Sequence, residues 1–111
     1  MSARLTSDFW VSAYVRRCQI EGAYALVRRR GAREAGAILI VVDWLDGAND
    51  VYAPAPQSEA DDVRGRSFER VAERIDGLAV EERIKRELKF DPDVWVVAVE
   101  DRRGRAFLDE A

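Results

Sequence analysis

Two short runs of apolar, largely β-branched residues constrain the fold of this 111-residue chain more than any other feature. The first is residues 37–43 (AILIVVD) and the second is residues 94–99 (VWVVAV). Side chains alternate between the two faces of a strand, so a run that is apolar at successive positions presents apolar groups to both faces. Branching at the β-carbon also favours a strand. We therefore predict that residues 37–43 form the central strand of a sheet and that residues 94–99 form a second apolar strand.

A helix is predicted before these strands, over residues 7–21. Ser7 can cap the free backbone amides at its start, and Asp8 complements the positive end of the helix dipole. Gly22 suits the left-handed residue that commonly ends a helix. Between these ends, apolar residues recur at the three- and four-residue spacing of a buried helical stripe: Val11, Tyr14, Val15 and Cys18.

The remaining segments complete an α-β-β-β-β-α-β order. They are a strand at 24–30, a hairpin turn at Asp46-Gly47, a short strand at 50–53 ended by Pro54, an edge strand at 67–71 and a helix at 78–89. Short connections favour antiparallel neighbours. We predict a single α+β domain over residues 1–111, with a mainly antiparallel sheet of four to five strands, an N-terminal helix and a second helix before the last strand. Residues 54–66 form a long polar loop, of the kind that serves as a lid or as a mobile surface segment.

The amino-acid composition excludes several functional classes. With no histidine and one cysteine, the chain has no Ser-His-Asp or Cys-His pair, no histidine-ligated metal and no internal disulfide. The net charge of −3 argues against a dominant role on nucleic acid or membrane surfaces, because generic phosphate binding requires an excess of positive charge. No apolar run is long enough to span a bilayer, and the N-terminus lacks an apolar signal core. We therefore expect a cytoplasmic protein.

Several short segments, taken together, resemble a known family. They are SDFWV at 7–11, RRG at 29–31, AG at 35–36, YAPAP at 52–56, FDPDVWVV at 90–97 and EDR at 100–102. In their order and spacing they resemble a family of short bacterial proteins, the domain of unknown function family 1491, over about residues 5–108. The resemblance implies a small, stand-alone bacterial protein and supplies no activity, cofactor or catalytic residue.

Arginines gather around the turn at Gly31. Arg28, Arg30 and Arg33 could bind a phosphate or a carboxylate bidentately, which makes them a candidate anion- or partner-binding site. The alternative interpretation is a charged, solvated strand end that prevents edge-to-edge aggregation. The binding interpretation requires these guanidiniums to converge on one concave region without each being tied to a carboxylate.

The three tryptophans are candidate interface residues, because tryptophan is enriched where proteins meet. Trp44 follows one apolar strand and Trp95 begins the other, so both can lie at a margin of the sheet, and Trp10 flanks the buried helical stripe. The alternative for each is a place in the core. Cys18 lies on the apolar face of the predicted helix, where a cysteine is buried and inert.

Carboxylates cluster on the predicted hairpin, but their spacing does not match a calcium loop. Asp43, Asp46 and Asp50 lack the acids at every second position that such a loop requires, and turn formation accounts for Asp46. We expect no metal and no cofactor. An enzyme would have to use carboxylate or tyrosine chemistry, for example through Tyr24 or Tyr52, and no catalytic constellation is evident.

The leading hypothesis is a non-enzymatic protein-interaction module that can self-associate. Two strongly apolar strands and several aromatic residues in so small a domain favour an exposed apolar surface that pairs with a protein partner or with a second copy. The alternative is an anion-, nucleotide- or RNA-binding domain that uses the arginines at 28–33. Neither hypothesis involves a membrane partner.

Overall fold

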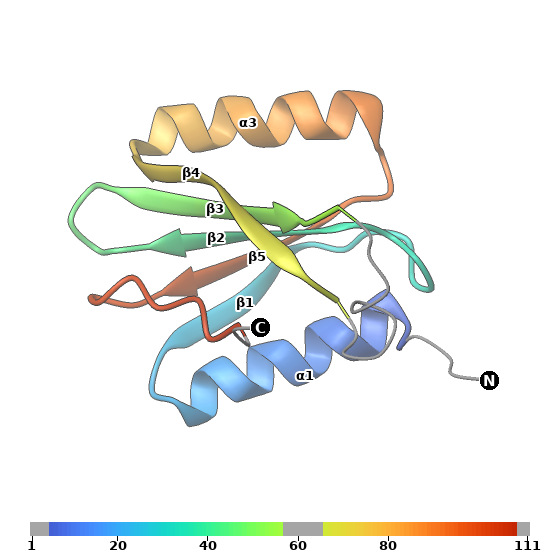
Figure 1. Cartoon of the computed structure of the whole chain (residues 1–111), viewed down its shortest axis with the longest axis horizontal. Coiled ribbons are helices and arrows are strands. Elements are labelled where there is room, and N and C mark those ends of the chain that lie inside the picture. The colour runs from blue at the N-terminus through green and yellow to red at the C-terminus, as the bar shows by residue number, and fades with distance from the viewer. Residues whose placement is uncertain (1–4, 57–65, 109–111) are drawn as a thin grey trace.

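The computed structural model describes residues 5–56 and 66–108, and its elements follow the predicted order. Helix α1 (Ser7–Ile20) is followed by β1 (Tyr24–Arg29), β2 (Ile38–Asp43), β3 (Asn49–Pro54), β4 (Phe68–Ile75), α3 (Gly77–Phe90) and β5 (Trp95–Glu100). The five strands form one sheet, with α1 on one face and α3 on the other (Figure 1). The predicted α+β fold is confirmed, and β4 extends beyond the expected edge strand to Ile75.

The structure describes only the two ends of the predicted loop at 54–66. Pro54 is the last residue of β3, Ala55 and Pro56 follow it, and Arg66 precedes β4, whereas residues 57–65 lie outside the described part of the chain. The prediction of a lid or a mobile segment concerns those residues and stays a prediction. Within the described ranges, no helix is long and apolar enough to cross a membrane.

The strand order is β1-β5-β2-β3-β4, which places β2 at the centre and makes β1 and β4 the edges. The pairs β2–β3, β3–β4 and β1–β5 are antiparallel, whereas β2 and β5 run parallel. Parallel neighbours require a crossover, which here passes through β3, β4 and α3. As a result β5 lies between β1 and β2. These two strands are consecutive in the chain but are not neighbours, which the short loop between them did not indicate.

Two apolar layers fill the space between the sheet and its helices. On the α1 side, alternate residues of β2 and β5 pack against the predicted helical stripe, including Val11, Tyr14 and Cys18. On the α3 side, the intervening residues of the same strands pack against Val80 and Ile84. Both central strands are thus covered on both faces, as their continuous apolar sequence predicted.

The start of α1 differs from the prediction in one respect. Thr6, not Ser7, caps the helix, and its hydroxyl accepts a hydrogen bond from the backbone N–H of Phe9 at 3.2 Å. Ser7 is fully buried, and its hydroxyl donates to the carbonyl of Gly36 at 2.6 Å. Ser7 therefore fastens the helix to the loop between β1 and β2, a long-range contact that a local capping rule does not contain.

That loop packs directly on the chain that enters β5. The backbone N–H of Ala32 donates to the Asp93 carbonyl at 2.9 Å, and the indole Nε1 of Trp95 donates to the Ala32 carbonyl at 2.8 Å. A Cβ atom at Gly31 would overlap the same Asp93 carbonyl oxygen and would also meet the Trp95 ring. Residue 31 must therefore be glycine for the loop to close over β5.

We expect Gly31→Ala to lower the free energy of unfolding by about 1–3 kcal/mol, because the added methyl group has to push a backbone carbonyl and a buried indole aside. The measurement is urea unfolding followed by tryptophan fluorescence. Gly77→Ala is the matched control: its Cβ meets nothing within 4 Å, and alanine at the start of α3 should raise stability by up to about 1 kcal/mol. Equal effects of the two substitutions would contradict the close approach at Gly31.

Candidate interaction surface

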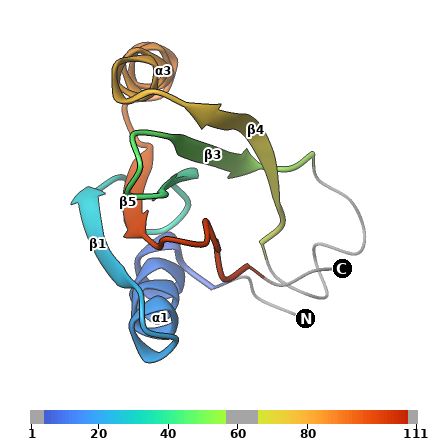
Figure 2. The same ribbon diagram turned by 90° about the vertical axis from the view of Figure 1, so that its left-hand side faces the viewer.

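Part of the sheet on the α3 side is not covered by that helix. Figure 2 shows α3 above the β3–β4 side of the sheet, with β1 at the opposite margin. On β1, Ala25 and Val27 point into the core on the α1 side, so strand alternation directs Tyr24 and Leu26 to the other face. There the exposed fraction of Tyr24 is 59% and that of Leu26 is 38%.

The neighbouring strand continues this surface. Tyr24 lies opposite Glu100 of β5, and Leu26 lies opposite Ala98. Side chains that are opposed in this way on one face of an antiparallel pair are close enough to interact. We call the surface the β1 face and define it by these residues and their neighbours at the ends of the strands: Tyr24, Leu26, Arg28, Asp43, Leu45, Ala98 and Glu100.

A cavity of about 440 Å³ opens on the β1 face where the carboxyl ends of β2 and β5 meet. Because these two strands are parallel and in register, their last residues, Asp43 and Glu100, stand side by side. Val41 and Val80 contribute apolar lining, and the start of α3 contributes Glu81. The volume of the cavity lies within the range of small-molecule sites, and the cavity is large enough for a long side chain.

Carboxylates dominate the charge of the cavity. Asp43, Glu81 and Glu100 line it together with a single guanidinium, that of Arg28. Arg28 forms an ion pair with Glu81. Among the described residues neither Asp43 nor Glu100 has a cationic partner, and the Asp43 carboxylate accepts only the backbone N–H of Leu45, at 2.7 Å. The cavity therefore favours an additional positive charge.

The hairpin between β2 and β3 holds Leu45 at the rim. Leu45 adopts a positive φ of 64°, which the hydrogen bond to Asp43 supports, and 44% of its surface is exposed. Asp46 accepts the backbone N–H of Ala48 at 3.0 Å and pairs with Arg74 of β4 at 2.8 Å. The hydrogen bond from Arg74 lowers the pKa of Asp46, so the pair is charged at neutral pH.

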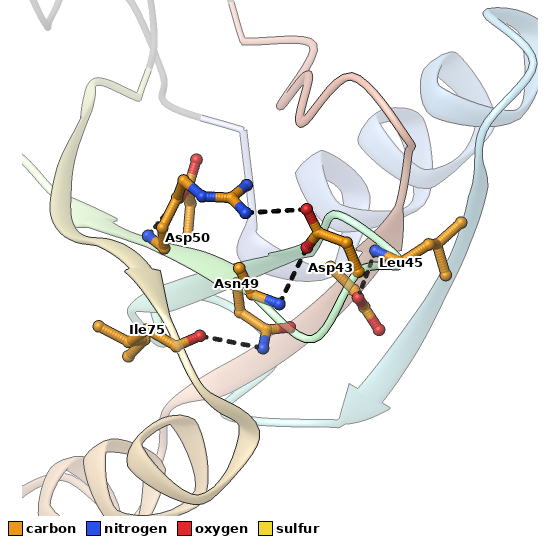
Figure 3. Close-up of polar contacts among 8 residues, drawn as sticks. Asp43, Leu45, Asn49, Asp50 and Ile75 are labelled. Atoms are coloured by element: carbon orange, nitrogen blue, oxygen red, sulfur yellow. Dashed lines mark hydrogen bonds and ion pairs between the residues drawn. The ribbon is translucent and has the colours of Figure 1, made fainter.

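The base of the hairpin is fixed to β4 by buried polar groups (Figure 3). The Asn49 side-chain amide donates to the Ile75 carbonyl at 3.3 Å. Asp50 is fully buried, accepts the backbone N–H of Arg74 at 2.9 Å and lies 3.7 Å from the guanidinium of Arg70. These contacts fit the irregular pairing of β3 with β4 and hold the hairpin in a fixed position beside the cavity.

The tryptophans proposed as interface residues are each used within the fold. Trp95 is 1% exposed and belongs to the core on the α1 side. Trp10 stacks on Tyr14, with ring centroids 5.0 Å apart. Trp44 is partly buried between the Arg74 guanidinium, 4.7 Å from its ring centroid, and the backbone at Gly104. None of the three belongs to the β1 face.

The arginine cluster does not converge on one region. Arg28 lines the cavity on the α3 side and is paired with Glu81. Arg30 and Arg33 both lie by Asp8 at the start of α1, at 3.1 Å and 3.6 Å, on the other side of the sheet. Each guanidinium has a carboxylate partner, so the geometry gives no support to an anion site built from these three residues.

Two other groups that could be reactive, a thiol and a phenol, are buried in the core. Cys18 is fully buried, and this burial raises the pKa of its thiol, so the group is protonated and inaccessible. Burial likewise raises the pKa of the Tyr14 hydroxyl above its ordinary value. Over residues 5–56 and 66–108, no three cysteine, aspartate or glutamate side chains come together as metal ligands would.

The apolar residues of the β1 face were not among the interface candidates from the sequence, where Tyr24 was named only for tyrosine chemistry. The signal was present, because Tyr24 and Leu26 alternate with Ala25 and Val27, which makes the start of β1 apolar on both faces. A helix covers only one of those faces in the structure. Leu45 could not be found in this way, since its exposure depends on the backbone conformation of the hairpin.

Asp101 secures the end of β5 next to the cavity. Its backbone N–H donates to the Asp43 carbonyl at 3.0 Å, which ties the ends of β5 and β2 together. Its carboxylate accepts two side-chain hydrogen bonds from Arg105, at 2.8 Å and 3.0 Å. These bonds hold the pKa of Asp101 below its usual range.

The fold and this surface define a small α+β protein with a five-stranded mixed sheet between two helices. The family model described as "Protein of unknown function (DUF1491)" matches residues 5–109, and the chain belongs to that family. The resemblance noted from the sequence is therefore confirmed. No curated protein matches the chain.

Solved structures of relatives have the same fold. The crystal structure of a DUF1491 family protein from Caulobacter crescentus CB15 is 34% identical, with a TM-score of 0.80, over 97% of this chain and 96% of that one. An NMR structure of a DUF1491 family protein from the same organism gives a TM-score of 0.79, also at 34% identity, with the same coverage of both chains. The solution structure of protein Atu0922 from A. tumefaciens is 37% identical, with a TM-score of 0.78, over 98% of this chain and 90% of that one.

Acid should weaken the fold partly through Asp101. Because its folded pKa is lowered, the Asp101–Arg105 pair stabilises the protein above the unfolded pKa of about 4, and this contribution is lost as the pH falls through the folded pKa. We expect Asp101→Asn to lower the urea midpoint at pH 7, and the difference from the parent protein to shrink as the pH falls below about 4. Arg105→Gln, which removes the same pair from the other side, should behave alike. A difference that is constant with pH would contradict this role.

Proposed function

We propose that this protein is a protein-interaction module that self-associates, with the β1 face of one copy docking on the β1 face of another. The observation that carries the proposal is the exposure of Tyr24 and Leu26 on the same face of β1, with Leu45 exposed beyond the strand ends Glu100 and Asp43. Contiguous exposed apolar groups rimmed by charge are typical of protein interaction sites. The occupant is a second copy of this chain.

The two edges of the sheet support this choice of surface. β4 carries the exposed charged residues Glu69, Arg70, Glu73 and Arg74, and its pairing with β3 is irregular. Charges and bulges of this kind discourage association at an edge. β1 also has a bulge, between Val27 and Arg29, but its first residues present Tyr24 and Leu26 to solvent on the face away from α1.

The charges on the β1 face also favour a second copy. A twofold interface brings the same patch of both subunits together, so the patch must complement itself. The β1 face carries the cation Arg28 and, toward its Tyr24 end, the anions Asp43 and Glu100. It can therefore meet itself with apolar groups against apolar groups and opposite charges opposed.

Leu26→Asp should block self-association. The substitution puts a charge into the apolar part of both copies, and we expect the dissociation constant to rise at least about tenfold. Sedimentation equilibrium over a range of micromolar concentrations measures this directly. Thermal unfolding of the same variant should show a folded protein, because Leu26 is already partly exposed.

Phe9→Asp is the matched control. Phe9 is 58% exposed, lies in the first turn of α1 on the opposite side of the sheet, and an acid there complements the helix dipole. This variant should associate like the parent protein. A parent protein that stays monomeric at the highest concentration, or equal effects of the two substitutions, would overturn the proposal.

A further inference from the structure

We infer that the cavity on the β1 face receives the Arg28 side chain of the second copy, which places that guanidinium against Glu100 and Asp43. This inference rests on the proposed self-association and adds to it the contact that sets its specificity. Each copy gives one arginine and accepts one, so the twofold interface contains the contact twice.

The charge of the cavity supports this contact. Its three lining carboxylates face one guanidinium, and that guanidinium is paired with Glu81, the carboxylate on α3. Asp43 and Glu100 project from the ends of two adjacent parallel strands and have no cationic partner within the described ranges. Two neighbouring carboxylates of this kind repel each other and favour a cation between them.

The shape and chemistry of an arginine side chain suit the cavity. A planar guanidinium with five donors can bond two carboxylates at once, which a compact ammonium group does less well. The apolar lining from Val41, Val80 and Ala98 suits the aliphatic stem of an arginine. Arg28 is the only residue of the β1 face with this chemistry, and 38% of its side-chain surface is accessible.

The position of Arg28 relative to the carboxylates also fits a twofold contact. Arg28 and Glu100 lie on the same face of the sheet, with Arg28 beyond Leu26 along β1 and Glu100 beside Tyr24. A twofold axis that passes near Leu26, in the plane of the interface and perpendicular to β1, carries Arg28 of each copy toward the Tyr24 and Glu100 end of the other. The ion pair with Glu81 is partly exposed and correspondingly weak, so Arg28 can exchange it for the second copy's carboxylates.

Charge reversal tests the contact. Arg28→Glu alone sets the introduced carboxylate against the native Glu100 of the other copy, and Glu100→Arg alone sets two guanidiniums against each other. Each variant should associate about tenfold more weakly than the parent, since every like-charge contact occurs twice. Glu69→Arg on β4 is the control for a charge reversal on an exposed strand, and it should leave association unchanged.

Mixing the Arg28→Glu and Glu100→Arg variants gives the decisive measurement. In a mixed dimer, the carboxylate introduced at position 28 of one copy faces the guanidinium introduced at position 100 of the other, and the remaining contact is the native arginine–glutamate pair. Sedimentation velocity with one variant fluorescently labelled should show association restored to within about threefold of the parent. A role of either residue in folding alone cannot be rescued in this way by a second chain.

The outcomes separate this inference from the proposal it rests on. A monomeric parent protein overturns both. Association that Leu26→Asp blocks, but that neither charge reversal weakens, leaves self-association standing and overturns the arginine contact. Weakened single variants that do not recover on mixing also overturn it, because the two residues then do not face each other across the interface.

Discussion

The parallel pairing of β2 with β5 is the constraint on which the rest of the structure depends. Both strands are apolar at nearly every position, so both faces of the pair must be covered, and α1 and α3 supply one layer each. The same pairing aligns two strand ends and thereby places Asp43 beside Glu100. A structural requirement of the core thus creates the acidic end of the β1 face.

Holding β5 between β1 and β2 requires a close contact with the loop that connects those two strands. Trp95 donates to the Ala32 carbonyl, and Ser7 of α1 donates to the Gly36 carbonyl in the same loop. Glycine at 31 and 36 allows the loop backbone to approach the Asp93 carbonyl, where any side chain would collide. Four of the segments that resemble the family come together here, at residues 7–11, 29–31, 35–36 and 90–97, so the structure explains them as packing contacts.

The sequence predicted the elements better than their arrangement. Residues 37–43 and 94–99 were identified as strands because β-branched runs have a strong local signal, and both helices were found from their periodicity. That β5 lies between β1 and β2 could not be predicted, since it depends on which strands find each other after a long crossover. The role of Ser7 also depends on a contact distant in the sequence. Its hydroxyl donates to the carbonyl of Gly36, so a rule based on neighbouring residues assigned it to a helix cap instead.

The candidate site was hidden from sequence reasoning by a different effect. Tryptophan enrichment at interfaces pointed to Trp95, but a large aromatic residue in a small domain is also the best available core filler, and in the structure Trp95 is 1% exposed. Tyr24 and Leu26, which remain on the surface, are smaller and lie on an edge strand, where a helix covers only one of two apolar faces. An edge strand that is apolar on both faces is therefore the more informative signal, because the fold buries one face against α1 and leaves the other exposed.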